Sequence, residues 1–260
     1  MLQRIARYIR NHDWFAVVVE ILVIIVGLML ALQLDRWRED RAELELEYIY
    51  INRLADDIAK DIPDIEYAID LQSMRLVLVN LLMEVAEDPD AALEYPLHFL
   101  GAIDQAAYTY TPTLTQHTFE NLRTTGDMRL IGSELLKEKL FEYYNYDEEQ
   151  RQYRPLQFMT ESRHFALAAG ILDRQQVTFI QDEFLFFRPG QIDEAAANVD
   201  IEEDRLREAA VRLGERTELI AWLPYVRSMQ LEQIEVHKAR LERANEALQV
   251  LTDYAESTSL

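Results

Sequence analysis

The residues best spaced for chemistry are Glu161 and His164, in the segment Glu-Ser-Arg-His. Three residues apart, the carboxylate and the imidazole would share one face of a helix. Carboxylate-bridged metal centres in helical bundles use two such pairs and two further glutamates from facing helices. The other histidines have no glutamate three residues before them; they are His12, His98, His117 and His237. We therefore interpret the pair as a chance spacing in a glutamate-rich chain, and we expect no metal and no cofactor.

Other catalytic patterns are missing from the sequence. Its seven glycines are not grouped as a phosphate-binding loop requires, and there is no cysteine to act as a nucleophile or zinc ligand. Neither a G-x-S-x-G turn nor an H-E-x-x-H helix occurs. Carboxylates are abundant, but their spacing singles out no acid–base pair. The sequence therefore predicts a protein that is not an enzyme.

Tyrosines gather in one stretch, at Tyr143, Tyr144 and Tyr146. Tyrosine combines apolar area with a hydroxyl group, which suits protein interfaces. These three residues are a candidate partner surface, and ordinary half-buried helix packing is the alternative. His237 lies in a heptad pattern near the C-terminus, and we interpret it as a core or interface histidine rather than a ligand.

The element that would position these residues begins with an apolar run from Trp14 to Leu34. About 20 helical residues cross a hydrocarbon core of ~30 Å. We predict a basic amphipathic segment over residues 1–13, a transmembrane helix over 14–36 and an acidic all-α soluble domain over 37–260. The run is longer than the apolar part of a cleaved signal peptide, and no small-residue cleavage site follows it, so we expect a signal anchor. Trp14 and Trp37 would be interfacial anchors at its ends.

One face of this predicted span carries an acid and small residues. Ala16, Glu20, Gly27 and Ala31 are separated by four, seven and four residues, which places them on one helical stripe. A small-xxx-small pattern lets a second helix approach closely, and a carboxylate at that depth usually faces a partner. We expect a membrane-helix contact here. The alternatives are a protonated carboxyl group, or one near enough to the interface to reach water.

Charge separates the two ends of the chain. Residues 1–41 hold six arginines against five acids, and the whole chain carries −21, so the remainder carries −22. Such a surface repels phosphate backbones, which excludes nucleic acid as a partner. The short basic tail favours an N-terminus inside the cell. In a Gram-negative bacterium this places the protein in the inner membrane, as a single-pass protein with a periplasmic domain.

The rest of the chain is expected to be helical. A heptad stripe, formed by Leu44, Tyr48, Ile51, Ala55, Ile58 and Ile62, predicts that the membrane helix continues to residue 62. Pro63 should open a second helix to about residue 86. Further helices are expected over residues 96–107, 115–124, 133–169 with a kink at Pro155, 193–213 and 218–254. Residues 176–188 are ambiguous between strand and apolar loop. We expect one single-span, all-α bundle whose two terminal heptad helices pair with each other or with another chain.

Two blocks of the sequence resemble a family of uncharacterised bacterial single-span membrane proteins, which is classed as a domain of unknown function. The first block contains Glu20, Gly27, residues 31–33 and Trp37. The second contains residues 118–122, 126–131 and the pair Tyr143-Tyr144. The resemblance implies an N-terminal anchor and a helical soluble domain, and it implies no activity or catalytic residue.

The function expected from these patterns is that of a non-enzymatic, membrane-anchored accessory subunit. It would contact membrane lipid and other membrane-protein helices, or a second copy of itself, through the anchor, and a further partner through the acidic domain. The alternative is a membrane-anchored helical-bundle sensor or ligand-binding domain. A carboxylate-bridged metalloenzyme is the remaining possibility, with the pair Glu161 and His164 as its only motif.

Overall fold

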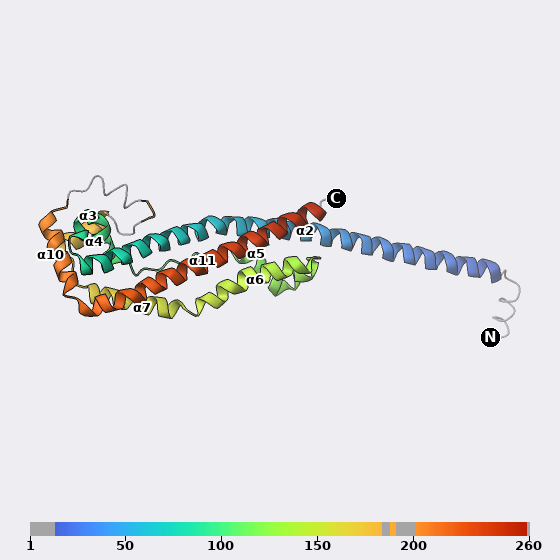
Figure 1. The fold of residues 1–260 in the computed structure, drawn as a ribbon. Helices are drawn as coiled ribbons and strands as arrows, with labels where there is room; N and C mark the ends of the chain where they lie inside the picture. The colour runs from blue at the N-terminus through green and yellow to red at the C-terminus, as the bar shows by residue number, and fades with distance from the viewer. Residues whose placement is uncertain (1–13, 184–187, 191–200, 259–260) are drawn as a thin grey trace.

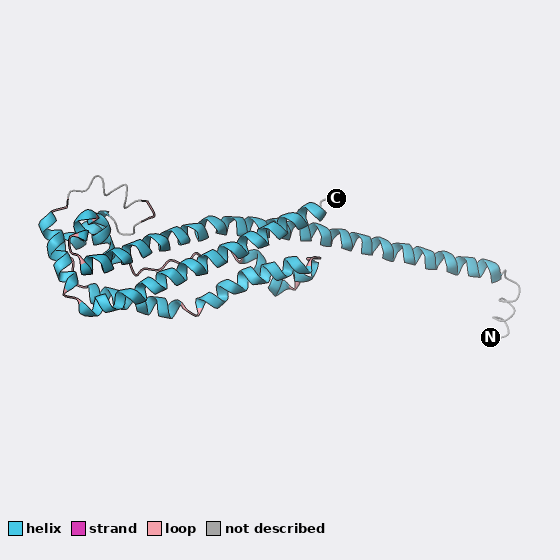
Figure 2. Cartoon of the chain, viewed as in Figure 1, coloured by secondary structure: helices cyan, strands magenta, loops and turns pink. Residues whose placement is uncertain are grey.

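The computed structural model describes residues 14–183, 188–190 and 201–258. Throughout these residues the regular structure is helical, without a strand (Figure 2). The predicted fold class is confirmed: the molecule is all-α, and its apolar N-terminal helix is continuous with a helical bundle.

Two long helices, α2 and α11, dominate the described structure. α2 runs from Trp14 to Glu87 and α11 from Thr217 to Thr258. Between them come α3 (Ala91–Glu94), α4 (Pro96–Gln105), α5 (His117–Thr125), the 3₁₀ helix η1 (Asp127–Leu130), α6 (Glu134–Arg151), α7 (Arg154–Ala168), α8 (Arg174–Glu183) and α10 (Glu203–Gly214).

The molecule is elongated, and α2 extends far beyond one end of it (Figure 1). α11 returns along α2, while α6 and α7 follow one another along α11. The elements α3, α4 and α10 cover the end remote from the N-terminus, and the C-terminus lies where α2 leaves the bundle (Figure 1). We call these two ends the distal and the proximal end.

α2 is a single helix, and the predicted helix boundary at Pro63 is wrong. A proline in a helix interior leaves the carbonyl four residues earlier without its N–H partner. Here both Pro63 and Ala59 are exposed, so water can bond that carbonyl. The neighbouring turns are held by Ile58 and Ile65, which are fully buried. Packing on both sides therefore carries the helix through the proline.

Two heptad stripes join α2 to α11. The buried positions of α2 alternate steps of three and four residues along its whole bundle part, as in Leu54, Ile58, Asp61 and Ile65. α11 repeats the pattern at Leu219, Leu223, Val226, Gln230, Gln233, His237, Arg240, Ala244, Ala247 and Leu251. A 3.5-residue repeat is the pattern of helices that pack as a coiled coil. The terminal helices thus pair with each other within one chain.

The stripe that the sequence suggested on α2 is only partly correct. Ile51 and Ile58 are buried as expected, and Ala55 and Ile62 are half-buried. Leu44 and Tyr48 are exposed, whereas Glu47 between them is buried and accepts a hydrogen bond from Tyr254 of α11, so the stripe that faces α11 runs through Glu47 instead. On α11, His237, Ala244 and Leu251 are fully buried, as the heptad pattern predicts.

The buried core consists of two apolar clusters. The distal cluster combines α2 from Leu78 to Val85 with α4, α10 and the start of α11. The proximal cluster combines α2 from Tyr50 to Ile65 with α5, α6 and the end of α11. Between them lie buried polar side chains, which we call the polar layer: Gln72, Arg75, Gln230, Gln233, His237 and Arg240.

Three further sequence expectations are corrected or limited by the structure. The predicted helix over 133–169 is two helices, because Pro155 ends α6 and occupies the first turn of α7. The ambiguous segment forms α8, and residues 184–187 lie outside the described structure. α10 begins at Glu203, while residues 191–200 of the predicted helix also lie outside it.

Other boundaries are confirmed. Ser133 caps α6, since its hydroxyl oxygen accepts a hydrogen bond from the N–H of Leu136 at 3.2 Å. Gly126 follows α5 with a φ of 80°, and Gly170 follows α7 with a φ of 82°. Both glycines adopt the left-handed conformation that commonly ends a helix.

Candidate functional site

The free part of α2 carries the stripe identified in the sequence. Every side chain from Val18 to Leu34 is exposed, and this is the one described helix long and apolar enough to cross a membrane. Glu20, Gly27 and Ala31 therefore lie on an uncovered surface. A Cβ atom added at Gly27 would meet no atom within 4 Å. Ala16 and Trp14 belong to the same helix, but their side chains lie outside the described residues.

Trp37 lies between this apolar surface and the bundle. Its side chain is 54% exposed, and the guanidinium carbon of Arg41 lies 5.2 Å from the ring centroid. An indole stacked with an arginine is amphipathic, which suits the boundary between lipid and water. The role of Trp37 as an interfacial anchor stays a prediction.

The candidate tyrosine surface is mostly wrong. Tyr143 is fully buried and Tyr144 is 3% exposed, so neither can meet a partner without unfolding. The Tyr143 hydroxyl donates to Asp61 Oδ2 at 2.9 Å, and burial beside that carboxylate raises its pKa. The Tyr144 hydroxyl donates to the carbonyl of Thr115 at 3.3 Å. These two tyrosines are therefore part of the buried proximal cluster.

Tyr146 differs from its neighbours because it faces an open groove between α6 and α11. It is half-buried, its hydroxyl donates to the carbonyl of Val236 at 3.4 Å, and the guanidinium carbon of Arg243 lies 4.1 Å from its ring centroid. Glutamates surround the groove: Glu138, Glu142, Glu149, Glu242 and Glu246. Lys139 bridges Glu142 and Glu246 across it, each at 2.8 Å.

The metal-like pair Glu161 and His164 is occupied by structural contacts. Glu161 accepts hydrogen bonds from the backbone N–H and the hydroxyl of Thr109. His164 is fully buried, and its Nε2 lies 3.1 Å from the carbonyl of Ile103. Burial lowers the pKa of His164 to about 4, despite that carbonyl contact. Among the described residues, no group of three or more His, Asp or Glu side chains is placed to hold a metal ion.

An extended segment, residues 106–116, crosses the polar layer; we call it the strap. Its backbone carbonyls are bound by side chains of the long helices. Gln230 Nε2 donates to the carbonyls of Ala106 at 2.8 Å and Tyr108 at 3.0 Å. Gln72 and Arg75 of α2 donate to the carbonyls of Tyr110 and Tyr108 respectively. Buried backbone groups need such partners. Gln72, Arg75 and Gln230 of the polar layer supply them to the strap.

Carboxylates of α2 hold the middle and the second end of the strap. The Tyr110 hydroxyl donates to Asp64 at 2.6 Å, and the N–H of Thr115 donates to Asp61 at 2.9 Å. Burial raises the pKa of Asp61, although its bonds from Thr115 and Tyr143 act in the opposite direction.

A chain of buried polar groups runs from the strap through α11 to α6. His237 Nε2 donates to the carbonyl of Tyr110 at 3.0 Å, and its Nδ1 accepts from Arg240 at 2.8 Å. This arrangement requires the neutral imidazole. Arg240, 1% exposed, also donates to Asp147 Oδ1 at 3.0 Å, while Arg151 donates to Asp147 Oδ2 at 3.0 Å. Burial and the neighbouring Arg240 lower the pKa of His237 to about 4.

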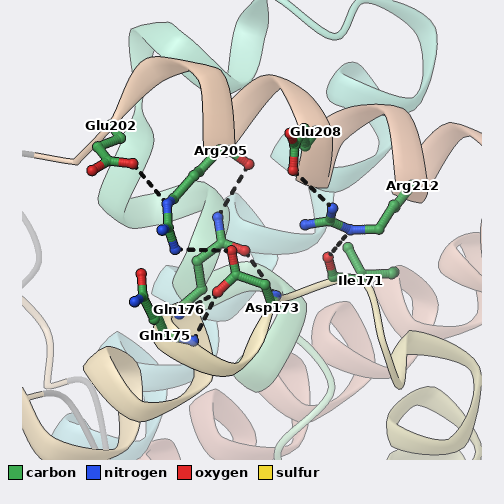
Figure 3. A network of polar contacts seen from close by, with 8 residues as sticks. All are labelled: Ile171, Asp173, Gln175, Gln176, Glu202, Arg205, Glu208 and Arg212. Atoms are coloured by element: carbon green, nitrogen blue, oxygen red, sulfur yellow. Dashed lines mark hydrogen bonds and ion pairs between the residues drawn. The ribbon is translucent and has the colours of Figure 1, made fainter.

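A second polar network joins α8 to α10 at the distal end (Figure 3). Asp173 caps α8: its Oδ1 accepts from the N–H of Gln176 at 2.9 Å, and Gln176 Oε1 accepts from the N–H of Asp173 at 2.9 Å. Arg205 of α10 reaches Asp173 at 3.3 Å and Glu202 at 2.7 Å. Although burial opposes it, the pKa of Asp173 is lowered by its backbone N–H bonds and by Arg205. The reciprocal Asp-x-x-Gln cap is a signal visible in the sequence that would have identified α8.

The sequence predicted a loop between the helices expected over 96–107 and 115–124, but it did not predict the polar layer that binds this segment. Gln230, Gln233 and Arg240 occupy heptad positions, and a polar residue at one such position marks a special layer of a helical pair. The heptad positions of these polar residues could be read from the sequence, but the strap carbonyls that the layer binds could not.

No protein-family model, no curated protein and no solved structure matches the chain. The resemblance of residues 14–62 and 112–146 to a family of bacterial single-span membrane proteins therefore stays a prediction. The geometry of the chain itself carries the functional argument.

Proposed function

We propose that this protein is a non-enzymatic accessory subunit, which docks in a membrane through α2 and contacts a partner outside it through the acidic bundle. The observation that carries the proposal is the double role of α2. Its first part is an uncovered apolar surface, and its second part is a central helix of the bundle. A surface of that size and composition needs lipid or protein to cover it.

The proposed location is the inner membrane of a bacterium, with the bundle in the periplasm. The apolar segment supplies the single span, and the arginines before it, Arg4, Arg7 and Arg10, favour the cytoplasm for the N-terminus.

The intramembrane partner would be a helix of another membrane protein or of a second copy. Gly27 and Ala31 permit close approach of a second backbone, and Glu20 adds a group that gains from a polar partner in lipid. The bundle, in contrast, presents an acidic surface with a net charge of −22 over residues 42–260. Its partner would be basic, and nucleic acid would not bind.

The test is recovery of companions from native membranes with tagged full-length protein in a mild detergent. Gly27→Leu and Glu20→Gln should each reduce recovery of the same companion protein, or of the second copy. Gly27→Leu cannot clash within the chain, since a Cβ at that position meets open space. Ile25→Phe is the matched control, because it enlarges the opposite face of the same helix. A lone monomer, or equal recovery with all three variants, would refute the intramembrane contact.

A sensor is the second candidate, and the polar layer is the observation that favours it. The buried chain from Tyr110 through His237 and Arg240 to Asp147 links the strap to two helices, α11 and α6. A ligand that disturbs this chain would act on α11, which packs along α2. The metalloenzyme alternative has no comparable support, and metal analysis of the purified protein without iron or manganese would eliminate it.

A further inference from the structure

A narrow cavity lies where α6 gives way to α7. Its volume is about 10 Å³, and it reaches from the surface to the polar layer of α11. A cavity of ~10–15 Å³, measured as the space open to a water-sized probe, holds about one water molecule. The cavity therefore has the size of a site for one monatomic ion and excludes organic ligands.

The cavity is cationic, although the domain around it is acidic. Arg151 and Arg154 are exposed at its mouth on either side of the helix break, and Arg240 is buried at its base. Among the described residues, Asp147 is the one carboxylate that lines it, and both of its oxygens are already bound by Arg151 and Arg240. His237 is neutral there because it donates to a carbonyl and accepts from Arg240. Two positive charges consequently remain uncompensated.

Several donors in the cavity have no protein partner. Arg240 Nε is buried without a hydrogen-bond acceptor. Arg154 forms no hydrogen bond or ion pair with the described residues, and neither does the side chain of Gln233, which is only 5% exposed. A buried donor that lacks an acceptor destabilises a protein by ~1–3 kcal/mol. Of the three, only Arg240 Nε is buried without a partner and carries that cost, and an anion in the cavity would accept from it and from the exposed Arg154.

Two of the cations also repel one another. Burial lowers the pKa of Arg240, and the charge of Arg154 acts in the same direction against the favourable effect of Asp147. Arg154 and Arg240 line the same small cavity, and guanidinium groups bind anions through charge-assisted hydrogen bonds.

We propose that Arg154, Arg240 and Gln233 form a binding site for a monatomic anion, of the size of chloride, at the junction of α6 and α7. The anion would connect the mouth of the cavity on α7 to α11. The proposal does not depend on the accessory role argued above, because it concerns the folded bundle alone.

The experiment uses full-length protein in detergent, with gluconate as the only other anion and constant ionic strength. Chloride or phosphate replaces gluconate stepwise, while the thermal midpoint is followed by circular dichroism and the chloride line width by ³⁵Cl NMR. Binding to the folded state should raise the midpoint saturably with the logarithm of ligand excess. Arg154→Gln should raise the dissociation constant for the anion at least tenfold. Arg163→Gln, an arginine of the same helix outside the cavity, should leave it unchanged.

Phosphate is too large for the cavity and serves as the size control: a saturable rise of the midpoint with chloride supports the site, and saturation by phosphate alone would overturn the proposal. If the thermal midpoint rises without saturating, or rises equally in wild type and Arg154→Gln, the anion acts only as a general salt, and the proposal is overturned. In gluconate alone, Arg154→Gln should be as stable as wild type or more so, because it removes the repulsion of Arg240. Lower stability there would assign Arg154 a structural role and also overturn the proposal.

Discussion

Two buried histidines, His164 and His237, are the side chains whose protonation matters most to the fold. Both are fully buried, and each donates to a backbone carbonyl, of Ile103 and Tyr110 respectively. Burial disfavours the charged imidazolium and lowers both pKa values to about 4, from 6.5. The folded protein therefore keeps both rings neutral at pH values where the unfolded chain is protonated.

We predict that this difference makes the protein less stable in mild acid. The unfolded chain binds protons below pH 6.5 and the folded chain does not, so stability falls from that pH down to about 4. At pH 5.5 each histidine should lower the free energy of unfolding by roughly 1 kcal/mol. The measurement is chemical unfolding of the full chain in detergent at several pH values.

The control for the pH effect separates the histidines from the carboxylates. His237→Gln should make the loss of stability between pH 7 and 5.5 about half as steep. His117→Gln, at the exposed start of α5, is the matched variant and should not change the slope. Asp61 acts in the opposite direction, because its raised pKa favours the folded state as the pH falls. An unchanged slope in His237→Gln would contradict the prediction.

The hydroxyl of Tyr143 should contribute measurably to stability. It is buried and donates to a carboxylate, and hydrogen bonds to charged groups are worth ~1.5–3 kcal/mol. Tyr143→Phe should therefore lower the free energy of unfolding by about 2 kcal/mol. Tyr225→Phe is the control, since Tyr225 is 64% exposed. Equal small losses in the two variants would show that the Tyr143 bond is not needed.

At the level of elements, the sequence predicted the helices well and their junctions less well. The heptads of α11 and the helix ends predicted at residues 124 and 169, beside Gly126 and Gly170, have local causes, so the pattern identified them. Pro63 misled because its effect depends on exposure of the turn and on burial of Ile58 and Ile65, which are tertiary facts. The burial of Tyr143 could not be predicted either, since only the fold places Asp61 opposite its hydroxyl. The stripe at Glu20 and Gly27 was found because it needs only helical periodicity.

Pro63 should be a weak point of α2 that can be repaired. Proline in a helix interior costs about 3 kcal/mol relative to alanine, and exposure of the site to water reduces that cost. Pro63→Ala should therefore raise the free energy of unfolding by about 1–2 kcal/mol. The same unfolding measurement tests it, with Pro96→Ala as the control at the first turn of α4, where proline is tolerated. Destabilisation by Pro63→Ala would mean that the proline shapes the bundle.

On the scale of the whole molecule, α2 should behave as one stiff rod across the boundary between apolar segment and bundle. The chain has no cysteine, so pairs of spin labels can be introduced without background. Labels at Leu32 and Arg53, both exposed, are separated by 21 residues of helix, or ~32 Å. Pulsed electron paramagnetic resonance should give a narrow distribution near that distance, apart from the length of the labels. A broad distribution would reveal a hinge.

Because α2 is unbroken, it also fixes the rotation of the bundle about the helix axis relative to the stripe of Glu20 and Gly27. Each helical residue turns the chain by ~100°, so the stripe of Glu20 and Gly27 and the face of the bundle have one rotational phase. Inserting a single alanine after Arg41 should turn the bundle by ~100° about the helix axis and disrupt any partner that engages both surfaces. Inserting seven residues completes nearly two turns and should restore the partner, though the bundle then stands ~10 Å further out. Recovery that depended on length alone, and not on phase, would show that the two surfaces work independently.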